Sequence, residues 1–173
     1  MDVEVRRAVE ADATEMARVH ARSWRATYAG LLPNPVIEHV VSLERRRAGR
    51  FSAILADPST RAAFFVATRD GAVIGMANWA PSGDADATDA TADVQTIYLD
   101  PDAIGQGIGR QLLAAVVEDI FARDFKAATL WVLDTNHRAR RFYEAAGWTA
   151  DGSRKDAEVA GAVLHEVRYR RQA

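Results

Sequence analysis

The sequence predicts an α/β fold of the α+β kind: one mixed, mostly antiparallel sheet of about six or seven strands, with helices on both faces. Short β-type runs recur along the whole chain, a strong hairpin signal lies in its first half, and a glycine-rich turn joins a strand to a helix past the midpoint. No linker, repeat or low-complexity segment divides the 173 residues. Residues 1–173 are therefore expected to form one domain, which at this length buries roughly 70% of its unfolded surface.

The first third predicts one strand followed by helices. Val3 to Arg7 alternates in polarity as a strand does, and residues 10–28 carry apolar side chains at helical spacing. Two prolines in the segment 33–35 break the chain. Residues 36–56 then predict one further helix, with the arginines 45–47 on its solvated face.

A hairpin is predicted next. Residues 64–68 and 73–79 are apolar runs separated by Asp70-Gly71, and this dipeptide favours the type I′ turn that matches strand twist. A loop rich in small and acidic residues, 81–92, follows.

The second half predicts a βαβ unit and a closing hairpin. Val94 to Leu99 reads as a strand that leads into the glycine turn, and Gly147 and Gly161 mark a helix end and a hairpin turn. The remaining expected elements are a helix at 107–123, a strand at 128–133, a helix at 137–146 and strands at 149–155 and 163–170.

The glycine turn predicts an anion site. Glycines 105, 107 and 109 place no Cβ atoms around a helix start, so backbone N–H groups can face an anion. A nucleoside-triphosphate loop is excluded because Arg110 stands where that motif needs lysine. A dinucleotide site fits poorly, since Arg110 also replaces its third glycine and the unit begins too late in the chain, although Asp134 could serve as the ribose acid. The pyrophosphate of coenzyme A is the third candidate.

Two blocks favour that candidate. Leu99 to Leu113 resembles motif A of the GNAT superfamily of acyl-CoA-dependent N-acyltransferases, and Leu130 to Trp148 resembles its motif B. Ser23 to Pro33 and Glu166 to Tyr169 give weaker matches to its acceptor-side helices and closing strand. The resemblance implies direct transfer of the acetyl group of acetyl-CoA to a primary amine through a ternary complex. An acyl-CoA-binding sensor without catalysis is the alternative.

By the same resemblance, N–H groups from about Gln106 to Arg110 bind the pyrophosphate, helped by the dipole of the helix that begins at Ile108. The family usually has Gln or Arg at the position of Ile104, so a side-chain contact to the cofactor is missing and weaker affinity is expected. The residues implied in cofactor binding are Ile97, Tyr98, Leu99, Gly105, Gln106, Gly107, Ile108, Gly109, Arg110, Asn136 and Tyr143.

Three residues are implied in catalysis. The N–H of Ile97 would polarise the thioester carbonyl, and Tyr143 would protonate the departing thiolate. Asp93 stands where several members carry a glutamate that deprotonates the amine; a water path is the alternative. Each has a structural alternative: a core strand for Ile97, packing for Tyr143 and a solvated loop for Asp93. Asn136 can act as a pantetheine ligand, as a helix N-cap, or as both.

Trp24, Tyr28 and Trp79 are implied in lining the acceptor pocket, although such rings are equally suited to a core. Asp84, Asp86 and Asp89 lack the spacing of a calcium loop, so no metal is expected. They predict either a mobile solvated loop or attraction of a cationic amine. The four histidines also lack metal-ligand spacing.

Composition restricts the function further. The chain has no cysteine, so an acyl-cysteine intermediate is excluded and a reducing compartment is favoured. A net charge of −2 argues against nucleic-acid and membrane partners, and no signal-peptide or membrane-spanning pattern is seen. We expect a cytoplasmic enzyme acting on a small-molecule or peptide amine, with the closing strands able to form a homodimer edge.

Overall fold

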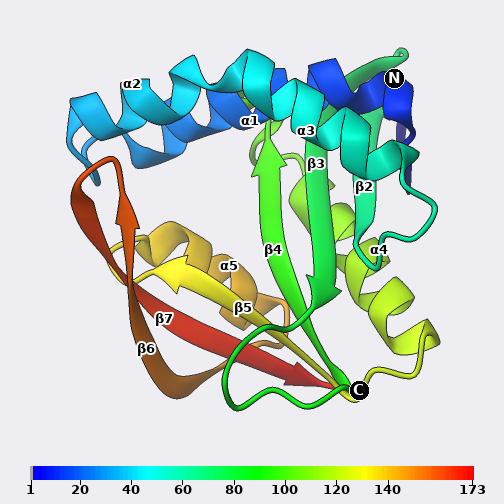
Figure 1. Ribbon diagram of the computed structural model, residues 1–173, viewed down its shortest axis with the longest axis vertical. Helices are drawn as coiled ribbons and strands as arrows, with labels where there is room; N and C mark the ends of the chain where they lie inside the picture. The colour runs from blue at the N-terminus through cyan, green and yellow to red at the C-terminus, as the bar shows by residue number, and fades with distance from the viewer. Residues whose placement is uncertain (1) are drawn as a thin grey trace.

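The computed structural model describes residues 2–173 and contains a seven-stranded sheet in the order β1-β2-β3-β4-β5-β7-β6. Only β4 and β5 pair in parallel, so the predicted mixed, mostly antiparallel sheet is confirmed (Figure 1). The strands are β1 (Val3–Arg7), β2 (Ala63–Arg69), β3 (Ala72–Pro81), β4 (Thr91–Leu99), β5 (Ala127–Leu133), β6 (Thr149–Val159) and β7 (Ala162–Gln172). The helices are α1 (Ala13–Tyr28), α2 (Asn34–Ser42), α3 (Glu44–Ala56), α4 (Ile108–Ala122) and α5 (His137–Ala145).

Helices cover both faces of the sheet, as predicted. Met16 of α1 and Phe51 of α3 pack against Phe64 of β2 on one face. Leu112 of α4 packs with Leu130 of β5 in the larger cluster on the other face, which α5 also covers (Figure 1). No helix among residues 2–173 combines the length and the apolarity needed to cross a membrane.

Two of the predicted turns have the expected backbone. Asp70 and Gly71 both have positive φ, 51° and 82°, as a type I′ turn requires. Gly147 has a φ of 84°, the left-handed conformation that ends α5. Few residue types tolerate positive φ, so the residues at these positions predicted the two turns specifically.

The predicted single helix at 36–56 is wrong. Leu43 stands between α2 and α3, and its N–H bonds to the Val40 carbonyl at 3.3 Å, which closes the end of α2. The predicted solvated face is also partly wrong. Arg45 and Arg46 are exposed, but Arg47 turns inward and donates to the Val40 carbonyl at 3.2 Å.

Strands β4 and β5 diverge, and this divergence creates the site. They pair only from Thr91 to Asp93 against 127–129, and beyond Asp93 the two strands separate (Figure 1). The β3–β4 register shifts between Asn78 and Trp79, which leaves an extra residue in β4. Such a bulge bends a strand, so β4 stays paired to β3 while it turns away from β5.

Candidate active site

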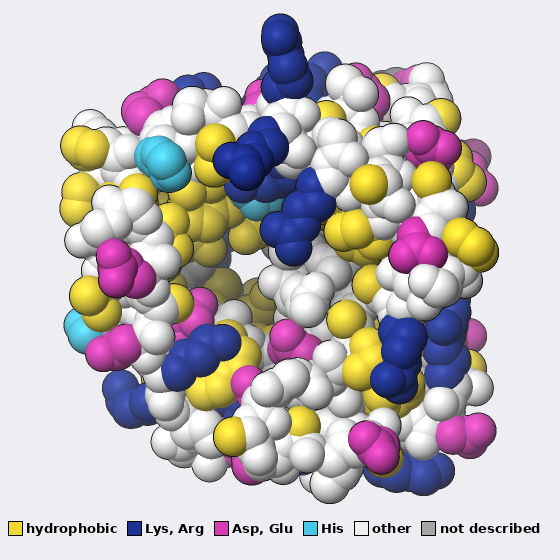
Figure 2. All heavy atoms as spheres, viewed as in Figure 1, with side chains coloured by type: hydrophobic (Ala, Val, Ile, Leu, Met, Phe, Trp, Pro, Cys, Tyr) yellow, Lys and Arg dark blue, Asp and Glu magenta, His cyan; other side chains and the backbone are white. Residues whose placement is uncertain are grey.

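A cavity of about 580 Å³ lies where β4 and β5 separate. Its walls come from these two strands, from α1, from α5 with the turn before α4, and from the β6–β7 hairpin. Figure 2 shows a hollow at this place, with hydrophobic side chains on its walls. The predicted site residues that line the cavity are Trp24, Tyr28, Ile97, Tyr98, Leu99, Gly105, Gly107, Gly109, Arg110, Asn136 and Tyr143.

The glycine turn presents a run of free backbone donors. Among residues 2–173, no hydrogen-bond acceptor pairs with the N–H groups of residues 105–109. The N–H of Arg110, predicted to be one of these donors, instead bonds to the Gly107 carbonyl at 3.1 Å. Gly105 and Gly107 have φ of 84° and 79°, and a Cβ at either would meet nothing within 4 Å. The turn therefore offers open space, unpaired donors and the positive end of α4, the combination that binds an anion.

Gln106 and Ile108 support this turn without lining the cavity. The amide of Gln106 donates to the Asp102 carbonyl at 2.7 Å, and its carbonyl oxygen accepts from Arg69. Ile108 is buried in the core under α4. Their side chains therefore fix the loop, and only their backbone N–H groups remain available to a ligand.

A close approach between β3 and α4 sets the position of the turn. A Cβ at Gly75 would lie 2.6 Å from a terminal methyl of Leu99 and 2.9 Å from one of Leu112, so a larger residue would force these side chains to move. Leu99 also lies against Gly109, where a Cβ would be 3.4 Å away. The small residues at these two positions allow α4 to begin directly beside the open edge of β4.

Tyr143 lies on α5 and is buried, with its ring 6.3 Å from that of Tyr169. Burial, together with nearby Tyr98, raises the pKa of the Tyr143 phenol well above 10. Because it lines the cavity, this protonated hydroxyl is available to a bound molecule. The helix is fixed at its start by Asn136, whose side chain accepts from the Ala139 N–H at 3.1 Å. The N-cap interpretation of Asn136 is therefore confirmed, while its side chain also lines the cavity.

Asp93 lies at the last paired position of β4 and β5, opposite Thr129. It does not line the cavity itself, and its Oδ1 is buried without a hydrogen-bond partner among the described residues. Burial raises its pKa to about 6, and the nearby Asp84 adds to the shift. Asp93 is thus no exposed loop residue: it is a half-buried strand residue, with Oδ1 fully buried, at the point where β4 and β5 separate.

Aromatic side chains from α1 and β4 form one wall. Trp24 donates its indole N–H to the Tyr98 hydroxyl at 3.0 Å, and its ring centroid lies 4.3 Å from that of Tyr28. His20 packs edge-on against Tyr98 at 4.7 Å, and burial lowers the pKa of this histidine to about 3. The wall is therefore rigid, and His20 stays uncharged behind it.

The placement of Trp79 in the acceptor pocket is wrong. Trp79 is buried on the face of the sheet that α4 covers, opposite to the face covered by α1, and its indole N–H donates to Asp119 of α4 at 2.8 Å. Its ring packs edge-on against Phe125 at 5.2 Å. The run at 73–79 is apolar on both faces, so alternation could not indicate which face Trp79 takes.

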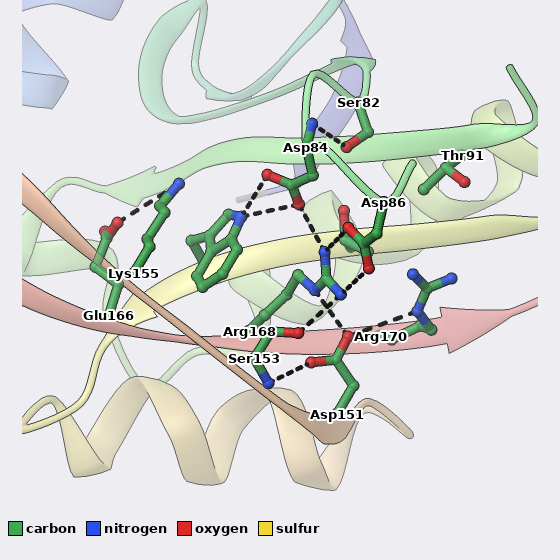
Figure 3. Close-up of polar contacts among 12 residues, drawn as sticks. Ser82, Asp84, Asp86, Thr91, Asp151, Ser153, Lys155, Glu166, Arg168 and Arg170 are labelled. Carbon is green, nitrogen blue, oxygen red and sulfur yellow. Dashed lines mark hydrogen bonds and ion pairs between the residues drawn. The ribbon is translucent and has the colours of Figure 1, made fainter. Parts of the chain in front are cut away.

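The acidic loop is held by one arginine. Arg168 of β7 is buried and binds Asp86 with two bonds of 2.6 Å, Asp84 at 3.0 Å and Asp151 at 2.7 Å (Figure 3). Asp84 is half-buried, while Asp86, with 57% of its side chain exposed, and Asp89 face solvent. The prediction of a mobile loop is therefore wrong for Asp84 and Asp86, which Arg168 holds in place, although Asp86 remains exposed to solvent. No cluster of metal-ligating type is present among residues 2–173.

Several cavity residues were missing from the sequence prediction, and two of them bear on the chemistry of the site. Trp131 of β5 and Glu166 of β7 line the cavity, and the indole of Trp131 donates to both oxygens of Asp84 at 3.1 Å. A signal was present: Val167 and Tyr169 alternate with Glu166 and Arg168, so one of the two sets had to face away from the core.

Comparisons with known proteins identify the class. A family model, Acetyltransferase (GNAT) family, matches residues 21–148. An uncharacterized N-acetyltransferase of Bacillus subtilis (strain 168), YuaI, is 30% identical over 166 residues, which is 95% of this chain and 90% of that protein. The crystal structure of PaiA N-acetyltransferase from Thermoplasma acidophilum in complex with coenzyme A has a TM-score of 0.78, 20% identity and full coverage of both chains. The yncA structure from Salmonella typhimurium, a putative acetyltransferase with its cofactor acetyl-CoA, has a TM-score of 0.69 and 15% identity, covering 99% and 94%.

The open sheet, with strands that diverge beside the start of α4, matches the fold of these acetyltransferase structures. The chain belongs to the GNAT acetyltransferase family.

Proposed function

We propose that this protein transfers the acetyl group of acetyl-CoA directly to a primary amine, with both substrates bound together. The observation that carries the proposal is the run of unpaired N–H groups at 105–109, which opens into the gap between β4 and β5. A pyrophosphate fits the first feature, and an extended polar arm that bonds to the free edge of a strand fits the second. Coenzyme A combines these two chemical groups in one molecule.

The reaction needs a polarised carbonyl, a proton donor and a proton acceptor. The amine nitrogen forms a bond to the carbonyl carbon, the carbon–sulfur bond breaks, and the thiolate leaves. We assign carbonyl polarisation to the N–H of Ile97, on the strand that lines the cavity. Tyr143 is assigned the donor role, because its raised pKa keeps the phenol protonated at neutral pH.

Asp93 is assigned the role of final proton acceptor. With a pKa of about 6, the carboxyl group is mostly ionised at neutral pH and yet more basic than an ordinary aspartate. Since Asp93 does not line the cavity, the proton passes to it through water rather than by direct contact with the amine.

Known relatives support the use of acetyl-CoA in an acetyl transfer. The B. subtilis relative carries an N-acetyltransferase name, and two structural neighbours contain coenzyme A or acetyl-CoA. The sensor alternative is favoured by one residue, Ile104, which lines the cavity where the family usually has a polar side chain. As part of the proposal, the reaction takes place in the cytoplasm, where a chain without cysteine needs no disulfides.

The test combines binding with turnover. Purified protein is titrated calorimetrically with acetyl-CoA, with ATP and NAD in parallel at the same salt, and release of the CoA thiol is then followed with a panel of primary amines. We expect selective micromolar binding of acetyl-CoA and thiol release with at least one amine. Binding without release by any amine would favour the sensor, and absence of acetyl-CoA binding would reject both.

A further inference from the structure

Glu166 and Trp131 lie on the acceptor side of the cavity, away from α4 and α5. Val167 and Tyr169 are in the core under those helices, so their neighbour Glu166 projects from the other face of β7. Leu130 and Val132 are in the same core, and Trp131 between them projects likewise. The backbone alternation therefore places an aromatic ring and a carboxylate together on the cavity wall.

Glu166 is the acidic side chain that a molecule in the cavity can reach. Within residues 2–173 it is the only aspartate or glutamate in the cavity lining. Asp84 and Asp86 are bound by Arg168, and Asp93 does not line the cavity. Glu166, rather than the acidic loop, is therefore the carboxylate that can attract a cationic amine in the cavity.

An ammonium group lies beside Glu166 and Trp131, on a residue that does not itself line the cavity. The Nζ of Lys155 is 4.3 Å from the centroid of the Trp131 ring and 3.7 Å from Oε2 of Glu166. The second distance is too long for a hydrogen bond, and the Lys155 side chain is 42% exposed on the edge strand β6 (Figure 3). The ring face and the carboxylate thus accept an alkylammonium ion, and their present occupant is weakly held and has free access to solvent.

We propose that Glu166 and the face of Trp131 form a subsite for an ammonium group that the acceptor carries in addition to its reacting amine. Lys155 is the intramolecular occupant, which the acceptor displaces. The inference rests on the proposed function and names its substrate class: diamines and other amines with a second positive charge.

The electrostatics of Glu166 support displacement. Burial raises the pKa of Glu166 and Lys155 lowers it, with burial the larger effect, so the carboxylate is incompletely compensated. A ligand ammonium can approach to hydrogen-bonding distance, which a lysine tethered to β6 does not reach here. The cation–π contact with Trp131 is kept in the exchange.

The test compares α,ω-alkanediamines with n-alkylamines of the same chain length. Acetylation rates are measured for wild type, Glu166→Gln and Lys155→Met, with Glu158→Gln as the matched control, since Glu158 is an exposed glutamate on the same hairpin outside the cavity lining. We expect Glu166→Gln to lower kcat/KM for diamines about tenfold, mainly through KM, and to change alkylamines less than about twofold. Lys155→Met should lower KM for diamines, and Glu158→Gln should match wild type.

Equal effects of Glu166→Gln on both amine series, or no effect, would overturn the subsite. Diamine binding to the CoA-loaded protein is measured by calorimetry in the same variants. If no amine is acetylated but diamines bind in a manner that depends on Glu166, the subsite stands and the catalytic proposal fails. If neither binding nor turnover depends on Glu166, the subsite is rejected whatever the activity.

Discussion

Tyr143 shows how burial prepares a side chain for one chemical task. Removal from water disfavours the phenolate, so the pKa rises and the hydroxyl remains a proton donor over the whole neutral range. Its ring is packed against Phe142 and Trp148, with centroid distances of 5.2 Å and 6.4 Å, which orients the hydroxyl. The side chain is therefore both positioned and kept protonated by the same packing.

Replacement of Tyr143 by phenylalanine should separate chemistry from binding. We expect kcat to fall about 100-fold, the scale of a lost general acid, while the Kd for acetyl-CoA stays within about twofold. Steady-state kinetics and calorimetry measure the two quantities.

Tyr169→Phe is the control for that variant. The Tyr169 hydroxyl donates to Glu144 at 2.6 Å and accepts from Arg140 at 3.2 Å, and it lies outside the cavity lining. Its loss should lower the melting temperature more than Tyr143→Phe does, with kcat near wild type. Parallel losses of affinity and turnover in Tyr143→Phe would show that Tyr143 packs against the ligand rather than reacting.

At the scale of elements, the glycine turn and α4 act as one anion-binding unit. Gly107 precedes the helix in the left-handed conformation, which directs the N–H groups of the first turn outward. The space beside it is open. A side chain at this position would therefore fill the volume expected for the pyrophosphate.

Gly107→Asp should abolish acetyl-CoA binding in calorimetry, a loss of more than about 100-fold, because it adds bulk and negative charge against a phosphate. Gly161→Asp is the matched control: Gly161 has a φ of 78° and an equally open Cβ position, but it lies in the β6–β7 turn. Both variants carry similar backbone strain of about 1–2 kcal/mol. Equal affinities in the two variants would reject the assigned pyrophosphate site.

The sequence predicted the elements best where backbone chemistry is local. Asp70-Gly71 and Gly147 require positive φ, so their residue types alone indicated the turns. The break at Leu43 carries no such signal, since an apolar residue without proline or glycine stands between α2 and α3. The bulge in β4 could not be predicted either, because an extra residue in a strand is not marked by any particular residue type.

At the scale of the whole molecule, how well each part of the site could be predicted depends on how far apart its residues lie in the sequence. The cofactor side is built from two short motifs whose residues are close in sequence. Gly105 and Gly107 were predictable from the first motif, and Tyr143 was predictable from the second. The acceptor side joins α1, β4, β5 and β7, and its charges are set by contacts such as Arg168 with Asp84, 84 positions apart. The binding of the acidic loop by Arg168 does not follow from local pattern, and the alternation in β7 could place Glu166 away from the core but could not show that it faces the cavity.

Arg168 connects the acidic loop, β6 and β7, so its removal should destabilise the whole fold. Arg168→Met leaves several carboxylates without their buried partner, and we expect the free energy of unfolding to fall by about 3 kcal/mol at pH 7. Denaturant unfolding measures the loss. Asp89→Asn, an exposed change in the same loop, should have no effect.

The loss of stability caused by Arg168→Met should become smaller as the pH falls. Hydrogen bonds from Arg168 lower the pKa of Asp86 to about 2, against about 3.9 in the unfolded chain. A depressed folded-state pKa contributes stability that is complete above the unfolded value and disappears as pH falls towards the folded value. The stability difference between wild type and Arg168→Met should therefore narrow as the pH falls from about 4 to 2, where Asp86 titrates. A difference that stays constant between pH 4 and pH 2 would show that Arg168 does not hold Asp86 ionised, and that the loop is fixed by its other contacts.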